Sequence, residues 1–165
     1  WSPVFLEQVA GIDRVTASGA LTLFYMAAIF GRLAGSRLTR RLRPDVLLAG
    51  AGVLVVAAFP VFWLARTPGL ALGALFVLGL GVANLFPLSL SAATTLGAAV
   101  ANKASARVSL AGGLAILIAP QVLGSLADQI GIQSAFLLAG LMGAGVLTLS
   151  AFAVWVQRRS APGQN

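Results

Sequence analysis

Two amides and one phenol are the side chains best suited to bind a polar ligand in this chain: Asn84, Gln121 and Tyr25. An amide has four hydrogen-bonding sites, and leaving them unpaired in apolar surroundings is costly. Each amide also lies close to a proline, Pro87 or Pro120, whose missing N–H leaves a helical carbonyl free to accept another hydrogen bond. We therefore expect Tyr25, Asn84 and Gln121 to contact a small-molecule substrate.

The sequence offers few of the side chains that enzymes use for catalysis. The sequence has no Cys and no His, so it offers no thiolate or imidazole metal ligand, no Ser-His pair and no disulfide. Its carboxylates lie at or beyond the ends of the apolar stretches, where they cannot form an apposed pair within a membrane: Glu7, Asp13, Asp45 and Asp128. We expect no enzymatic activity, no metal site and no cofactor.

The elements that must position these side chains are five stretches free of charged residues: 15–31, 46–65, 67–102, 108–127 and 129–157. A helix of about 20 apolar residues crosses a hydrocarbon core of about 30 Å, so all five qualify. The sequence therefore predicts an all-α membrane protein whose transmembrane helices cover about 17–38, 46–65, 69–97, 108–127 and 132–156.

The two ends of the sequence differ from this transmembrane bundle, which we assign to residues 7–159. Residues 1–6 are an apolar stub that stops at Glu7, as the last turns of a preceding transmembrane helix would. Residues 160–165 are polar and contain Pro and Gly, so we expect a disordered tail.

The basic residues predict an orientation. Nine of the eleven Lys and Arg residues fall in alternate connections or after the last stretch, and only Arg14 and Arg66 do not. Because Lys and Arg concentrate on the cytoplasmic side, we expect an integral protein of a bacterial plasma (inner) membrane, with its N-terminus outside and its C-terminus in the cytoplasm. The net charge of +7 then reflects contact with anionic lipid, and no nucleic-acid partner is expected.

The stretches also differ in polarity. The second and fifth hold few polar side chains, whereas the first, third and fourth carry stripes of Ser, Thr, Tyr, Asn and Gln at helical spacing. Polar spans tend to face protein or a water-filled cavity, so these three are predicted to be central and the other two peripheral. For any single Ser or Thr, a hydrogen bond to the preceding helical turn is the simpler explanation.

The connection after the first span carries the most specific motif, Gly31-Arg-Leu-Ala-Gly-Ser-Arg-Leu-Thr-Arg-Arg-Leu42. It resembles the cytoplasmic signature loop of the major facilitator superfamily, in which Gly, Leu, an acidic residue and a basic cluster join two helices. The positions that fit this pattern are Gly31, Leu33, Ala34, Arg37, Arg40 and Arg41. Arg32 also belongs to the loop, and Gly35 departs from the pattern because it stands where the acidic residue is usual. The spacing of Gly31 and Gly35 also fits a close contact between helices.

This resemblance implies a specific architecture. Residues 1–6 would end the seventh helix, and the five spans would be helices eight to twelve, most of one six-helix bundle. The chain would then be the C-terminal half of a secondary active transporter that moves a small solute by alternating access together with its N-terminal half. The alternatives are a non-transporting membrane scaffold or degenerate transporter fragment, and, less favoured, a channel.

Overall fold

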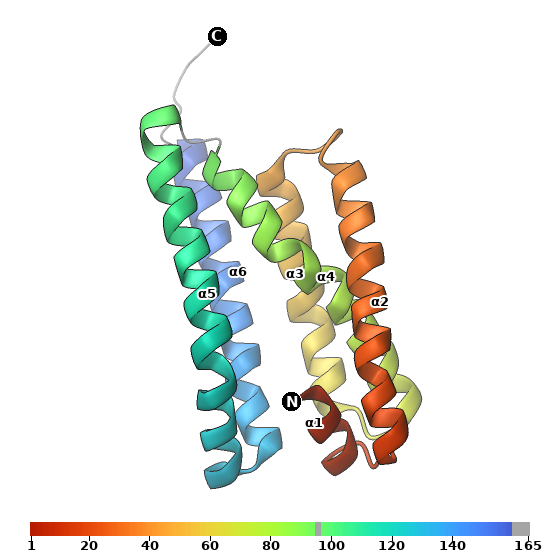
Figure 1. Ribbon diagram of the computed structural model, residues 1–165. Helices are drawn as coiled ribbons and strands as arrows, with labels where there is room; N and C mark the ends of the chain where they lie inside the picture. Colours follow the sequence, from red (N-terminus) through yellow and green to blue (C-terminus); the bar gives the residue numbers. More distant parts are fainter. Residues whose placement is uncertain (95–96, 160–165) are drawn as a thin grey trace.

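The computed structural model describes residues 1–94 and 97–159, and regular secondary structure in these ranges is entirely helical (Figure 1). The helices are α1 (Ser2–Gln8), α2 (Arg14–Leu38), α3 (Pro44–Leu64), α4 (Pro68–Thr94), α5 (Gly97–Ile130) and α6 (Ile132–Arg159). Four of them, α2 to α5, are long and apolar enough to cross a membrane. The predicted all-α membrane fold is confirmed.

The long helices run alternately up and down (Figure 1). We call the upper end the one with the α2–α3 connection, residues 39–43, and the lower end the one with α1 and the α3–α4 and α5–α6 connections. Helix α4 packs on both α2 and α3, and α6 packs on α3 and α5. In Figure 1, α4 crosses the bundle obliquely, and α2 and α5 form its two edges.

Several helices extend further than the hydrophobic pattern predicts. Helix α2 begins at Arg14 rather than near residue 17, because Asp13 caps it by accepting a hydrogen bond of 3.0 Å from the Thr16 N–H. This bond lowers the pKa of Asp13 below its usual value. Helix α5 begins at Gly97 rather than near residue 108. Polar and charged residues continue a helix beyond the membrane core when no helix breaker intervenes.

The remaining boundaries depend on short turns. Helix α4 covers Pro68–Thr94, and α5 continues to Ile130. The chain then reverses at Gly131, whose positive φ of 82° suits glycine. Helix α1 covers Ser2–Gln8, so the apolar stub of residues 1–6 is helical. The predicted tail, residues 160–165, lies outside the described residues.

The best-packed core lies at the lower end. The Phe5 ring stacks on Phe62 at a centroid distance of 4.8 Å and contacts Phe136 at 4.9 Å, so that α1 ties α3 to α6. Nearby, the Trp63 indole N–H donates a hydrogen bond of 2.7 Å to the Gln133 carbonyl. Buried Ala and Leu residues from α2 and α4 complete this core. The upper end is more open, which matters for the cavities described below.

Candidate functional site

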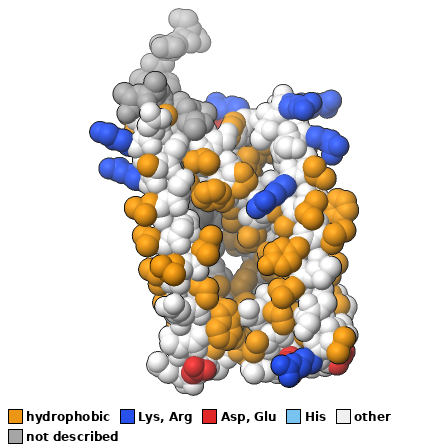
Figure 2. All heavy atoms as spheres, viewed as in Figure 1, with side chains coloured by type: hydrophobic (Ala, Val, Ile, Leu, Met, Phe, Trp, Pro, Cys, Tyr) orange, Lys and Arg blue, Asp and Glu red, His pale blue; other side chains and the backbone are white. Residues whose placement is uncertain are grey.

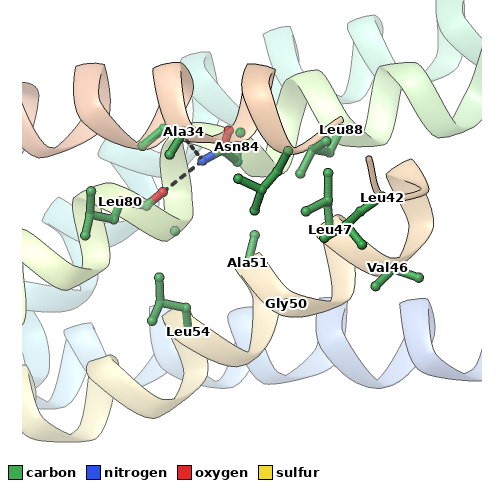
Figure 3. A pocket seen from close by; sticks show the side chains of 14 residues that line it. Ala34, Leu42, Val46, Leu47, Gly50, Ala51, Leu54, Leu80, Asn84 and Leu88 are labelled. Carbon is green, nitrogen blue, oxygen red and sulfur yellow. Dashed lines mark hydrogen bonds between the residues drawn. The ribbon is translucent and has the colours of Figure 1, made fainter. Parts of the chain in front are cut away.

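Asn84 lies where α4 crosses α2. Its amide donates hydrogen bonds to the Gly31 carbonyl of α2, at 2.8 Å, and to the Leu80 carbonyl of α4, at 3.0 Å (Figure 3). Its amide oxygen lies against Gly35. The bond to Gly31 joins the two helices, whereas the bond to Leu80 stays within α4. The amide oxygen keeps the capacity to accept a hydrogen bond.

This crossing depends on small residues. A Cβ on Gly31 would lie 2.9 Å from the Leu80 Cα, and a Cβ on Gly35 would collide with the Asn84 amide. A Cβ on Gly79 would lie 2.9 Å from the Ala27 Cβ. Glycines allow helix backbones to approach closely in membranes, and here they also give the Asn84 amide access to a backbone carbonyl.

The predicted signature loop is largely helical. Gly31 to Leu38 form the last two turns of α2, and only residues 39–43 connect it to α3. Leu33 and Arg37 are exposed. Arg40 and Arg41 belong to the connection and are also exposed. Helix α2 ends at Leu38, as does the span predicted over residues 17–38, so of the signature residues only Arg40 and Arg41 lie in the connection.

A cavity of about 550 Å³ opens between α2 and α4. Its lining includes polar groups from both helices: Arg32, Ser36, Thr39, Asn84 and Ser91. The Arg32 side chain is exposed and makes no ion pair within the described residues. Ser36 and Thr39 donate their hydroxyls to the Leu33 and Ser36 carbonyls, so their oxygens remain available mainly as acceptors.

The other two predicted contacts lie elsewhere. Tyr25 lies on α2, two helical turns before Arg32, and is 62% exposed. Gln121 lies on α5, is exposed, and makes no hydrogen bond within the described residues. Neither lines the cavity that includes Asn84. The structure thus brings Asn84 together with the signature segment, and leaves Tyr25 and Gln121 on open helix faces.

Helices α2 and α5 also border a hollow on one side of the molecule. Figure 2 shows the surface hollowed between the column formed by α5 and the one formed by α2, with apolar side chains on both sides. None of the most apolar part of α5 is buried, although its sequence predicted a central helix. Helices α2 and α5 therefore present surfaces that this chain alone does not cover.

Comparison with known proteins supports the same family. The family model described as "Major Facilitator Superfamily" matches residues 1–165. The chain belongs to the major facilitator superfamily. It is similar to "Membrane protein MosC" of Rhizobium meliloti, with 26% identity over 97% of this chain and 39% of the relative. It is also similar to an uncharacterized MFS-type transporter of Yersinia pestis, with 30% identity over 96% of this chain and 40% of the relative.

An uncharacterized transporter of Sinorhizobium fredii is 27% identical over 91% of this chain and 40% of its own length. The chain thus spans about two fifths of the length of the curated relatives it matches. No solved structure matches it. Superfamily membership identifies the chain as a transporter segment in a membrane.

Sequence reasoning missed the partner of Asn84. Nothing in the spacing of α4 indicates that its amide donates to Gly31, 53 residues earlier. The usable signal was the Gly31–Gly35 spacing, because the close helix contact that it allows is present in the structure.

Proposed function

We propose that this chain is the C-terminal half of a secondary active transporter that moves a small solute by alternating access. The observation that carries the proposal is the uncovered, hollowed side between α2 and α5 in a chain of this superfamily (Figure 2). Alternating access needs two bundles that rock about a shared site near the bilayer midplane. An N-terminal half seated over this side would cover α5 and enclose Tyr25 and Gln121.

In this proposal, Tyr25, Asn84 and Gln121 contact the solute from three helices, and Arg32 adds a positive charge at the upper edge of the site. All four carboxylates lie in connections or in terminal helical turns: Glu7, Asp13, Asp45 and Asp128. A proton-coupling carboxylate must be desolvated for its pKa to approach the working pH. We therefore place any such group outside this chain.

The amide variants test the site. In the complete transporter, Gln121→Ala should weaken solute binding by about 1 kcal/mol, roughly fivefold, because one hydrogen bond to the solute is lost. Asn84→Ala should weaken binding at least as much, because it also removes the hydrogen bond from α4 to the Gly31 carbonyl of α2. Binding would be titrated with a solute first identified by a thermal-shift screen.

Thr148→Ala is the matched control. The Thr148 hydroxyl donates a hydrogen bond of 2.9 Å to the Gly145 carbonyl within α6, so its loss should leave solute binding unchanged. Gln121→Ala is the cleaner variant because the Gln121 amide has no hydrogen-bond partner to lose among the residues that the structure describes. Unchanged affinity in a folded Gln121→Ala protein would remove Gln121 from the site.

The proposal places the upper end of Figure 1 in the cytoplasm, where its basic residues face anionic lipid. Single cysteines introduced in a cysteine-free protein test this. An impermeant thiol reagent applied to intact cells should label Gln8→Cys, Thr67→Cys and Gln129→Cys, but neither Thr39→Cys nor Asn102→Cys. Labelling of Thr39→Cys from outside would reverse the orientation.

A further inference from the structure

A second hollow lies on the other side of the α2–α4 crossing, between α2, α3 and α4. It is a groove of about 490 Å³ in the upper half of the bundle (Figure 3). This volume falls within the range of about 300–1,000 Å³ found for ligand pockets. Gly35, Asn84 and Leu88 separate it from the cavity lined by Arg32, because they line both spaces.

The walls of the groove are almost entirely aliphatic. Leu42, Val46 and Leu47 lie near its upper end, and Leu54 and Leu80 lie further down (Figure 3). Asn84 is the one polar side chain in the lining, and its amide hydrogens are already bonded to backbone carbonyls. The groove therefore suits a hydrocarbon chain and offers little to a polar solute.

Exposure shows where the groove opens. Leu42, in the α2–α3 connection, is 46% exposed, and Val46 and Leu54, on α3, are 47% and 38% exposed. Because α3 is one of the two spans predicted to be peripheral, we expect this apolar opening to face the bilayer.

The rim at the upper end is strongly basic. Leu38, at the end of α2, and Leu42, in the α2–α3 connection, line the groove. The same segment of the chain contains Arg37, Arg40 and Arg41. These three side chains are exposed and make no ion pair within the described residues. Arg43 alone is paired, through a contact of 3.1 Å from its Nε to Asp45. Figure 2 shows basic side chains gathered above the ends of α2 and α3.

We propose that this groove binds one anionic glycerophospholipid, with an acyl chain between α2, α3 and α4 and the phosphate held by Arg40 and Arg41. A guanidinium group donates two parallel hydrogen bonds to two oxygens of one phosphate. Clustered arginines beside a membrane attract anionic headgroups. Charge complementarity at the rim and an aliphatic groove directly below it match the two parts of such a lipid. The proposal deepens the general contact with anionic lipid proposed above, and it does not depend on which solute is transported.

The test is lipid-dependent stabilisation of the complete, delipidated protein in detergent. Dioleoyl phosphatidylglycerol should raise Tm by several degrees, because a ligand that binds only the folded state stabilises it. Dioleoyl phosphatidylcholine and inorganic phosphate should each give little shift, since one lacks net charge and the other lacks acyl chains. Arg40→Gln/Arg41→Gln should lose most of the phosphatidylglycerol shift.

The groove itself is tested with Gly50→Leu, because Gly50 lines it and a Cβ there meets nothing within 4 Å. This variant should fold and also lose the shift. Gly73→Leu is the matched control on α4, since Gly73 is equally open and does not line the groove. Lys103→Gln/Arg107→Gln removes two charges from α5 and should keep the shift.

Three results would overturn the proposal. A shift that survives both Gly50→Leu and Arg40→Gln/Arg41→Gln would show that no lipid binds here. A shift lost equally in Lys103→Gln/Arg107→Gln would show that the shift depends on general surface charge. A concentration-dependent dimer that covers the groove would show that a second copy of the chain, and not a lipid, occupies it. Uptake measured after reconstitution of the same variants into liposomes separates this outcome from failure of the transport proposal, because lipid stabilisation requires no uptake.

Discussion

Gly31→Leu is expected to prevent stable packing of α2 on α4. A Cβ on Gly31 would lie 2.5 Å from the Leu80 carbonyl oxygen and 2.9 Å from the Leu80 Cα. These are backbone atoms, so the helices must separate to admit any side chain. Overpacking typically costs about 1–3 kcal/mol and can cost more. Here separation also breaks the hydrogen bond from Asn84 to Gly31. We expect most of the complete protein to be lost from the monodisperse fraction in detergent.

Gly19→Leu is the matched control for this prediction. Gly19 lies on the same helix, is exposed, and a Cβ there meets nothing within 4 Å. It should give a yield and Tm close to those of the unmodified protein. If Gly31→Leu were as stable as Gly19→Leu, the close α2–α4 crossing would not exist in the membrane.

The spanning helices were predictable because charge is costly in hydrocarbon. Arg43 and Asp45 near one end of α3, and Arg66 beyond the other, bracket its 21 residues. The same rule does not locate the helix ends outside the membrane core. Lys103 and Arg107 bound an apolar stretch, but they do not stop the helix that begins at Gly97.

The candidate site was less predictable than the fold. The sequence favours Asn84, Gln121 and Tyr25 as ligand contacts because each is an unusual polar group in an apolar span. Whether such a group turns toward a ligand or toward another helix depends on how the helices cross, and the sequence pattern of one span does not contain that information. Asn84 thus proved to be bonded across the α2–α4 crossing, whereas Tyr25 and Gln121 remain on open faces.

Gly35 belongs to the signature motif and also makes a close contact between α2 and α4. Gly35 stands where the signature motif usually has an acidic residue. In this chain the space beside Gly35 is filled by the Asn84 amide from α4. A side chain from another helix thus occupies the space beside Gly35, and the motif alone does not predict this contact.

The reactivity of a cysteine at Tyr25 tests most directly whether the open face of α2 lines a water-filled cavity between two halves. Tyr25 is 62% exposed and Val53, on α3, is 56% exposed, so exposure in this chain does not distinguish them. We expect Val53 to face lipid and Tyr25 to face the cavity.

The measurement uses the complete, otherwise cysteine-free transporter and a hydrophilic, impermeant thiol reagent. A thiolate forms and reacts only where water reaches it. Tyr25→Cys should react both in intact cells and in inverted vesicles, because alternating access opens the cavity to each side in turn. Val53→Cys should react in neither preparation. A Tyr25→Cys protein as inert as Val53→Cys from both sides would contradict the proposed cavity and, with it, the assignment of this chain as half of an alternating-access transporter.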